Sequence, residues 1–504
     1  MIKSIEKNKT LLFGVFTYIS ISLLIIFYNH HYYDDEIFNL SKMSWSFSKI
    51  YIYIQNHDVH PPLSYLINKS LYNLFFSYKA ILIFSIIINV LALGYFYKFA
   101  KNKLRDNNSK VLLFLFVFIN GGLLLWTNSV RWYAYWTPLF IILYTFLLKN
   151  RSLTSQKIIN ISMLLSVMTY INYLTFLLIV GLAIFFIFFR SDNINIKNII
   201  IFCLTYFFLS ASQIFFFITV HMHNKESQVS SALNSFLNAI YGILNGGSVF
   251  IADPIFLLFS IFTFLILIFG FKRIFIYRKE GINFFLLQNV GFLMILSFLM
   301  ITTGVSGKYR NNIALSIPFY FIVSYFFYYI KNKKFKYIYL ALALVLSVES
   351  TYNLISHANT SKNSYNMPIA KLEKRILPSN KNLIFSHDPV ISFYFSTKGY
   401  KVYDLARDKE DKVIPKDTNL YLVKTYQGSL SDQEYQKIVS LYKSISNKID
   451  ELKKEKVGID RYANIKNKLP GNRPKIDQVQ IYLFSGKLRD NLHIDLREKI
   501  IKEN

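Results

Sequence analysis

Residues 80–99 read AILIFSIIINVLALGYFYKF, and this stretch decides the class of the fold. A helix of about 20 mainly apolar residues is long enough to cross the hydrocarbon core of a bilayer. Comparable runs recur along the first 355 residues, so we expect an α-helical polytopic membrane protein with about eleven transmembrane helices. The predicted spans are 11–28, 80–99, 111–127, 132–148, 158–170, 173–189, 199–220, 249–271, 284–303, 312–330 and 337–355.

The overall composition favours the same class and excludes others. Of the 504 residues 53% are hydrophobic, and the single cysteine, Cys203, lies in an apolar run. A disulfide within the chain and a cysteine-based zinc site are therefore excluded. The net charge of +28 is spread over short loops and the C-terminal part without a nucleic-acid-binding motif, so we expect membrane lipids, and no nucleic acid, as partners.

The distribution of basic residues predicts the orientation in the membrane. With the N-terminus inside, the inner segments before residue 356 carry 21 lysines and arginines, and the outer segments carry 8. Because positive charge collects on the cytoplasmic side, we expect a cytoplasmic N-terminus, with residues 29–79 and 356–504 outside. The first span is followed by no small-residue cleavage site, so we expect it to be retained.

The composition changes near residue 356, which we take as a domain boundary. Residues 1–355 are expected to form the transmembrane domain. Residues 356–504 are polar, contain no candidate span and are expected to form a small extracytoplasmic α/β domain. Its predicted strands are 382–386, 401–404, 419–424 and 478–484, and its predicted helix is 431–446.

The first outer loop, 29–79, carries the pattern of helices that lie along the membrane interface. Pro61 and Pro62 suit the first turn of a helix, and an apolar stripe at helical spacing follows them. We expect Asn68, Lys69 and Asn73 on the helix surface away from this stripe. The stripe comprises Leu63, Leu66, Ile67, Leu71, Leu74 and Phe75. A second such helix is expected within 37–55, and a third stripe runs from Leu233 to Leu244 in the loop 221–248.

The triplet Asp34-Asp35-Glu36 stands out because the first 355 residues hold only 11 acidic residues in all. Adjacent carboxylates repel each other, which raises the pKa of at least one of them and suits a general base. We therefore interpret the triplet as catalytic. The alternative is a solvated charge run beside a span.

Several basic residues on the same predicted side suggest a site for a lipid phosphate. Arg131 precedes Trp132 and Tyr133 at an outer turn, and Lys308 and Arg310 lie at another. A planar guanidinium suits a phosphate, although each residue alone would also suit an anchor to lipid headgroups.

The histidine at the start of the interfacial helix has several possible roles. His60 suits a proton shuttle, a metal ligand, a phosphate contact, or a histidine packed at the helix entry. Histidines 30, 31 and 57 are near it in the sequence but show no regular metal-ligand spacing. We therefore predict no metal site and no certain cofactor, and leave a divalent cation open.

These motifs together resemble the GT-C superfamily. An Asp-Glu pair after the first span, the run His60-Pro61-Pro62-Leu63, an Arg-x-Tyr turn at Arg131, and a basic-aromatic turn followed by Pro318 are similar to those of polyprenyl-phosphate-sugar-dependent glycosyltransferases. Members of this group include the protein O-mannosyltransferases of glycosyltransferase family 39 and the lipid A aminoarabinose transferases. The resemblance covers residues 1–355.

The resemblance implies an inverting sugar transfer in a bacterial inner membrane. A polyprenyl-phosphate-linked sugar would be the donor, and a hydroxyl of a glycan, lipid or protein would be the acceptor. Asp35 would match the base and Glu36 its pair, with Asp34 as an extra acid that leaves the register open by one residue. His60, Arg131 and Tyr133 would bind the donor, helped by Lys308 or Arg310. In this sequence Ser64 departs from the commoner Pro-Pro-Leu-Tyr-Tyr run, a change that touches packing more than chemistry.

Two other functions are alternatives. A polysaccharide polymerase or ligase would favour a large central outer loop with paired arginines. A lipid-linked glycan transporter would favour inverted repeats and charges within the spans. Neither pattern is evident in the sequence, so the glycosyltransferase hypothesis is preferred.

Overall fold

The structure is a computed structural model that divides into two compact units. Unit 1 comprises Met1–Phe27 and Lys42–Ile355, and unit 2 comprises Tyr28–Ser41 and Ser356–Asn504. Residues 28–41, which the sequence analysis assigned to the transmembrane domain, are thus grouped with unit 2. The residues described are 2–26, 36, 39–40, 42–43, 45–57, 60–150, 152–189, 195–221, 243–244, 253–276, 281–303, 309–376, 379, 381–405, 411–425, 440–445, 447, 453–460, 479–495 and 500–502.

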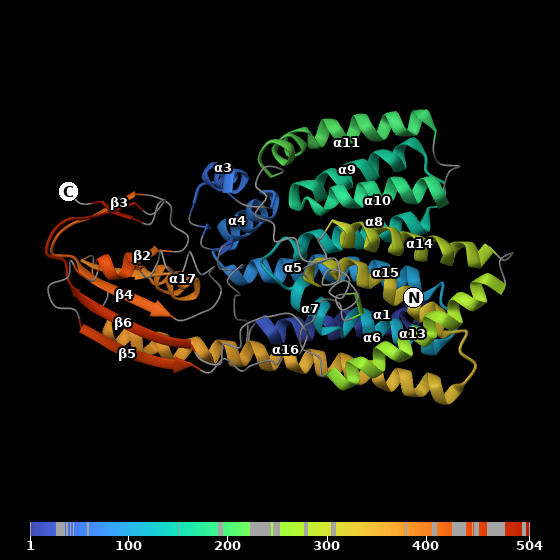
Figure 1. The fold of residues 1–504 in the computed structure, drawn as a ribbon. Coiled ribbons are helices and arrows are strands. Elements are labelled where there is room, and N and C mark those ends of the chain that lie inside the picture. The colour runs from blue at the N-terminus through green and yellow to red at the C-terminus, as the bar shows by residue number, and fades with distance from the viewer. Residues whose placement is uncertain are drawn as a thin grey trace. The chain divides into compact units, whose positions relative to one another are not determined.

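Unit 1 is a bundle of helices, and each of the eleven predicted spans overlaps one of them (Figure 1). The helices of the first half are α1 (Ile2–Leu24), α3 (Phe47–His57), α4 (Leu63–Phe75), α5 (Tyr78–Lys101), α6 (Asn107–Phe118), α7 (Gly121–Thr127), α8 (Tyr133–Lys149) and α9 (Ser155–Ile171). Those of the second half are α10 (Leu174–Phe189), α11 (Ile196–Phe216), the π-helix η3 (Phe217–His221), α13 (Asp253–Ile276), α14 (Gly281–Thr302), the 3₁₀-helix η5 (Tyr309–Asn312), α15 (Ile313–Phe327) and α16 (Lys333–Arg375).

Length and composition identify which helices can cross a membrane. Among the described residues, three helical stretches are both long and apolar enough: Tyr78–Lys101, Asn107–Leu125 and Ile196–Thr219. Five shorter apolar helices accompany them, at Lys9–Leu24, Leu174–Phe189, Phe256–Lys272, Leu287–Thr302 and Ile313–Phe327. The last of these, α15, is the centre of the bundle. All of its residues are buried, and it packs against α6, α8, α13 and α14.

Two predicted spans differ in detail from the helices observed. The span 111–127 is interrupted, because the side chain of Asn120 accepts a hydrogen bond from the backbone N–H of Leu123 at 3.0 Å and so starts a second helix, α7. The next residue, Gly121, lies so close to α16 that a Cβ there would come within 2.7 Å of the backbone of Ser350. The span 337–355 belongs to α16, which continues as a helix to Arg375.

Both expected helices of the first loop are present, as α3 and α4. Figure 1 shows them at one end of unit 1, with the turn between α15 and α16 at the opposite end. Of the third stripe, 233–244, only residues 243 and 244 are described, and these two are helical.

Unit 2 contains a five-stranded sheet in the order β2-β1-β4-β6-β5 and a three-stranded sheet in the order β3-β7-β8. In the larger sheet β1 is parallel to β2 and β4, whereas β6 is antiparallel to β4 and β5. The elements are β1 (Asn382–Ser386), α17 (Pro389–Thr397), β2 (Lys401–Asp404), β3 (Asp411–Ile414), β4 (Asn419–Thr425), β5 (Lys453–Asp460), β6 (Val479–Lys487), β7 (Leu492–Asp495) and β8 (Ile500–Lys502).

The alternation of side chains along β1 builds a core on each face of the larger sheet. Leu383 and Phe385 belong to one buried cluster, together with Leu441 and Ile445 of a helical segment. Ile384 belongs to the other cluster, with residues of α17 and of the end of α16. The helical segment is residues 440–445, and the rest of the predicted helix 431–446 lies outside the described residues.

Candidate functional site

Helix α4 turns its polar face into the protein. Its buried residues are Ser64, Tyr65, Asn68 and Lys69, whereas the apolar Leu74 and Phe75 are 69% and 57% exposed. The expectation that Asn68 and Lys69 would lie on the helix surface is therefore wrong. The reason is that an interfacial helix can place its apolar stripe against membrane lipid. Its polar face is then left to pack against the helix bundle.

Asn68 ties α4 to the turn that precedes α8. Its amide nitrogen donates to the carbonyl of Val130 at 3.1 Å, and its amide oxygen accepts from the hydroxyl of Tyr135. On the far side of the same turn, Asn89 of α5 donates to the carbonyls of Thr127 at 3.2 Å and Ala134 at 2.9 Å. Two buried asparagines thus fix the backbone that carries Arg131.

Two lysines of the first outer loop, Lys42 and Lys69, are also buried at this end of unit 1. Lys69, 8% exposed, donates to the carbonyl of Met43 and lies 5.8 Å from the ring of Tyr72. Lys42, 2% exposed, lies 5.5 Å from the ring of Trp45 and 5.3 Å from that of Tyr53. Aromatic faces and a backbone carbonyl are favourable partners for a buried cation. Both lysines are therefore held by neighbouring groups at this end of unit 1.

Arg131, Trp132 and Tyr133 stand together at the start of α8, and all three are buried. The rings of Trp132 and Tyr133 lie 4.1 Å apart, and the carbonyl of Arg131 accepts from the backbone N–H of Ala134 at 3.1 Å. The indole Nε1 of Trp132 is buried and has no hydrogen-bond acceptor among the residues that the structure describes. A buried donor of this kind requires an acceptor from outside the described part of the protein.

His60 lies beside Trp132, with 5.7 Å between the ring centroids, and its Nδ1 is 3.3 Å from the amide nitrogen of Asn172. The orientation of the Asn172 amide is fixed by its other atom, because Oδ1 accepts from the backbone N–H of Leu174 at 2.7 Å. The amide nitrogen therefore faces His60 and donates to Nδ1. A neutral imidazole that accepts at Nδ1 carries its proton on Nε2.

The sequence analysis did not single out Asn172, Asn68, Lys42 or Lys69 for the site. Asn172 lies in the turn between α9 and α10, where its peptide carbonyl accepts from the Thr175 hydroxyl at 2.8 Å. Polar residues at four-residue spacing on α4, Ser64 with Asn68 and Tyr65 with Lys69, were a usable signal for a second helix face. For Asn172 the sequence carried no signal, because its partner is 112 positions away.

The acidic and outer basic residues are only partly described. Asp34, Asp35 and Lys308 lie outside the described residues, and so does the side chain of Arg310, whose backbone is part of η5. Glu36 is 2% exposed and is grouped with unit 2. Within the described residues, no group of three or more His, Cys, Asp or Glu side chains is arranged to hold a metal ion. Asp34, Asp35 and the histidines at 30 and 31 are not among those residues.

A further acidic residue lies in α16. Glu349 is half-buried, and its Oε2 accepts no hydrogen bond from the described residues. It directly precedes Ser350, the residue closest to Gly121 of α7. Glu349 was not among the residues predicted for the site.

Comparisons with known proteins identify the fold. No protein-family model and no curated protein matches the sequence. Solved structures do resemble the fold, among them ArnT from Cupriavidus metallidurans in the apo state, with a TM-score of 0.58, and the same protein bound to undecaprenyl phosphate, with a TM-score of 0.55. Both are 10% identical in sequence. The first match covers 95% of this chain and 98% of ArnT, and the second covers 94% and 98%. The predicted fold class, a helical polytopic membrane protein, is therefore confirmed, and this chain has the fold of ArnT.

Proposed function

We propose that this protein is an inverting glycosyltransferase that moves a sugar from a polyprenyl phosphate to an acceptor hydroxyl. The reaction would take place on the extracytoplasmic face of a bacterial inner membrane, in the assembly of a cell-envelope glycan or glycoconjugate. The fold shared with ArnT, which has been crystallised with undecaprenyl phosphate, supports a polyprenyl-phosphate lipid as a partner. The acceptor would be a glycan, a lipid or a protein.

The observation that carries the proposal is the set of donors at the start of α8. The buried Arg131 precedes Trp132, whose indole N–H has no acceptor among the described residues. The ring of His60 lies 5.7 Å from that of Trp132, and an Nδ1 that accepts from Asn172 would leave the proton on Nε2. A phosphate oxygen can accept from the indole N–H of Trp132, and the guanidinium supplies the matching charge.

These residues would act on the leaving group. As the bond between the anomeric carbon and the phosphate oxygen breaks, its electron pair passes to that oxygen. Donors and cations already in place stabilise the charge that develops there. The acceptor oxygen forms the new bond from the opposite face of the sugar and loses its proton to a carboxylate, for which we propose Asp35. Glu36 and Asp34 would assist, and Tyr133, Lys308 or Arg310 would complete the donor site.

Binding of undecaprenyl phosphate to the purified full-length chain tests the donor site directly. We expect saturable binding that is lost in Arg131→Ala and weakened several-fold in Trp132→Phe, which removes the indole N–H and keeps an aromatic ring. Equal affinity of the wild type and both variants would refute the phosphate site.

The reaction itself is tested in membranes supplied with a labelled polyprenyl-phosphate sugar. Covalent transfer of the label to an acceptor is the expected result. Movement of intact labelled lipid across the membrane would instead indicate a transporter. Growth of a polymer on a diphosphate-linked carrier would indicate a polymerase or ligase.

A further inference from the structure

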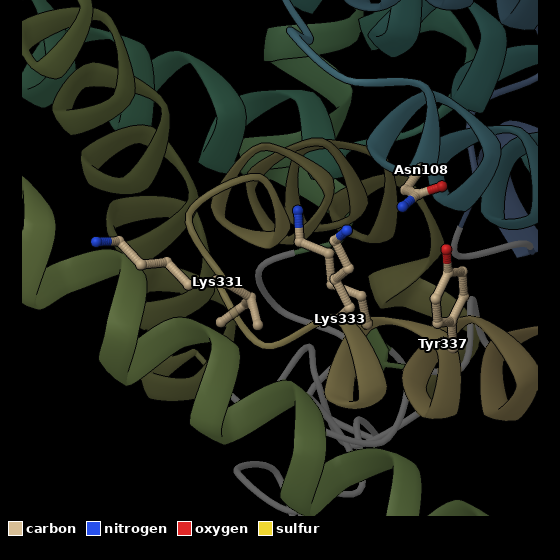
Figure 2. A pocket seen from close by; sticks show the side chains of 6 residues that line it. Asn108, Lys331, Lys333 and Tyr337 are labelled. Atoms are coloured by element: carbon tan, nitrogen blue, oxygen red, sulfur yellow. The ribbon is translucent and has the colours of Figure 1, made fainter.

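A pocket lies at the end of unit 1 opposite to the candidate site. It has a volume of about 210 Å³ and is lined by Asn108, Ile330, Lys331, Lys333, Lys336 and Tyr337. Asn108 is in the first turn of α6, and the other residues come from the turn before α16 and its first turns. Figure 2 shows the hydroxyl of Tyr337 directed toward the side chain of Asn108, while Lys331 extends to the other side. The pocket therefore combines cations with neutral polar groups.

The charge of this pocket is only partly balanced. Lys336 forms an ion pair with Asp106 at 3.1 Å and donates to the carbonyl of Tyr328 at 3.2 Å. Lys331 and Lys333 have neither an ion pair nor a hydrogen bond to any residue that the structure describes. Asp106 is thus already occupied by Lys336, and two ammonium groups remain for an anion.

An exposed apolar stripe begins at the same pocket. Tyr337 lines the pocket, and Leu344, Val348 and Tyr352 follow it at helical spacing along α16. All four are exposed, from 47% for Leu344 to 67% for Tyr352. An anion held in the pocket would therefore have an apolar surface directly beside it, on one face of one helix.

We propose that this pocket binds the phosphate-bearing headgroup of an anionic membrane lipid, whose acyl chains lie along the stripe on α16. The lysines at 331 and 333 supply the charge, and Tyr337 and Asn108 supply hydrogen bonds. The site is separate from the donor site proposed above: α5 joins the two ends of the unit, and its 24 residues span about 36 Å.

The test uses native mass spectrometry of the purified full-length chain, titrated with phosphatidylglycerol or with phosphatidylcholine. The variant is Lys331→Gln together with Lys333→Gln. The control is Lys197→Gln with Lys272→Gln, which removes the same charge from two exposed lysines of α11 and α13. We expect one phosphatidylglycerol bound in preference to phosphatidylcholine, with an affinity that falls about 30-fold in the variant and stays unchanged in the control.

Two results would overturn the proposal. One is equal affinity for the two lipids, or equal affinity of the variant and the wild type. The other separates a lipid from a free anion: if glycerol 3-phosphate or inorganic phosphate binds as tightly as phosphatidylglycerol, the stripe contributes nothing and the pocket takes a soluble phosphate. Failure of undecaprenyl phosphate to bind at Arg131 would leave this result unaffected, because neither lysine belongs to that site.

Discussion

The two ends of unit 1 hold their cations in opposite ways. At the end formed by α4 and the turn before α8, Lys42, Lys69 and Arg131 are each less than 9% exposed. At the other end, Lys331 and Lys333 are exposed, and Lys336 is paired with Asp106. An exposed lysine keeps its hydration and hardly affects the free energy of folding. A buried cation loses hydration, and other interactions in the fold must offset this loss of stability. The cations of the first end are therefore held inside the protein by neighbouring groups, whereas Lys331 and Lys333 at the other end are exposed.

The largest effect is expected from the proposed base. Asp35→Asn should lower sugar transfer by about 10²- to 10⁴-fold, because an amide cannot take the proton of the acceptor hydroxyl. The rate is measured in membranes with a labelled donor, and protein levels are checked in parallel. Asp34→Asn and Glu36→Gln serve as matched variants that resolve the register of the triplet. Full activity of Asp35→Asn would remove this residue from the mechanism.

The next largest effect is expected at Arg131. Arg131→Ala should lower kcat/KM for the donor by about 10²- to 10³-fold, because the charge opposite the leaving phosphate is lost. Arg131→Lys keeps the charge but not the planar fork and should fall between the wild type and the alanine variant. Lys197→Ala removes an exposed cation far from the turn and should have no effect. An unchanged kcat/KM in Arg131→Ala would break the comparison between the two ends.

A stability effect is expected at Asn68, which is completely buried. Asn68→Leu leaves the Val130 carbonyl and the Tyr135 hydroxyl without their partner, which should cost about 1–3 kcal/mol. Asn73→Leu on the exposed side of the same helix is the control and should change stability by less than about 0.5 kcal/mol. Thermal unfolding in detergent compares the two variants. Equal effects would mean that the buried polar face of α4 does not support the turn.

A smaller effect is expected from Asn172, which orients His60. Asn172→Leu should weaken donor binding by about tenfold at every pH, because one hydrogen bond to the ring is lost. Asn172→Asp should instead raise the pKa of His60, since a carboxylate accepts from Nδ1–H and favours the imidazolium. Donor binding would then strengthen as the pH falls through the raised pKa. The ¹⁵N shifts of His60 report the tautomer directly, and a proton on Nδ1 in the wild type would contradict the assignment.

The smallest effect is expected at the opposite end, at Asp106. Burial alone would raise the pKa of this carboxyl, but hydrogen bonds from Ser109 and Lys336 outweigh burial and lower it below its ordinary value. A carboxyl with a lowered folded-state pKa stabilises the fold above its unfolded-state pKa, and this contribution is lost as the pH falls through the folded-state value.

Asp106→Asn should therefore cost under about 1 kcal/mol at neutral pH and nothing in strong acid. Asp106→Ala also removes the acceptor for the Ser109 N–H at the start of α6 and should cost about 1 kcal/mol more. Unfolding at two pH values measures both variants. A difference between Asp106→Asn and the wild type that persists in acid would exclude the ion pair as its cause.

Much of the fold could be predicted because the signals are local. Each of the eleven predicted apolar spans overlaps a helix, and alternating apolar residues located β1, β2, β4 and β6. The other strands are short or lie in polar surroundings, and no strong local pattern distinguishes them. The stripe after Pro62 predicted α4 correctly, but Asn68 and Lys69 were placed on the surface and are buried, because the periodicity of a helix does not say what surrounds it.

The candidate site could also be predicted only in part. The motifs selected His60, Arg131 and Tyr133, which the structure describes at the start of α4 and of α8. Trp132 lies between Arg131 and Tyr133 in the sequence, but no motif indicated a role for it. Its role is inferred from the structure, where its indole N–H is buried without an acceptor among the described residues. Asn172 could not be predicted, since no pattern in a single sequence joins it to His60.

The sequence by itself determined that this is a helical membrane protein with a small α/β unit, because the free energy of burying an apolar residue depends on the residue and its neighbours in the chain. Only the tertiary structure decided which face of α4 is buried, that Lys42, Lys69 and Arg131 lie inside the protein, and that Asn172 faces Nδ1 of His60. Each of these depends on a partner distant in the sequence, such as Val130 for Asn68 or Asn172 for His60. The geometry and burial of such contacts exist only once the chain has folded.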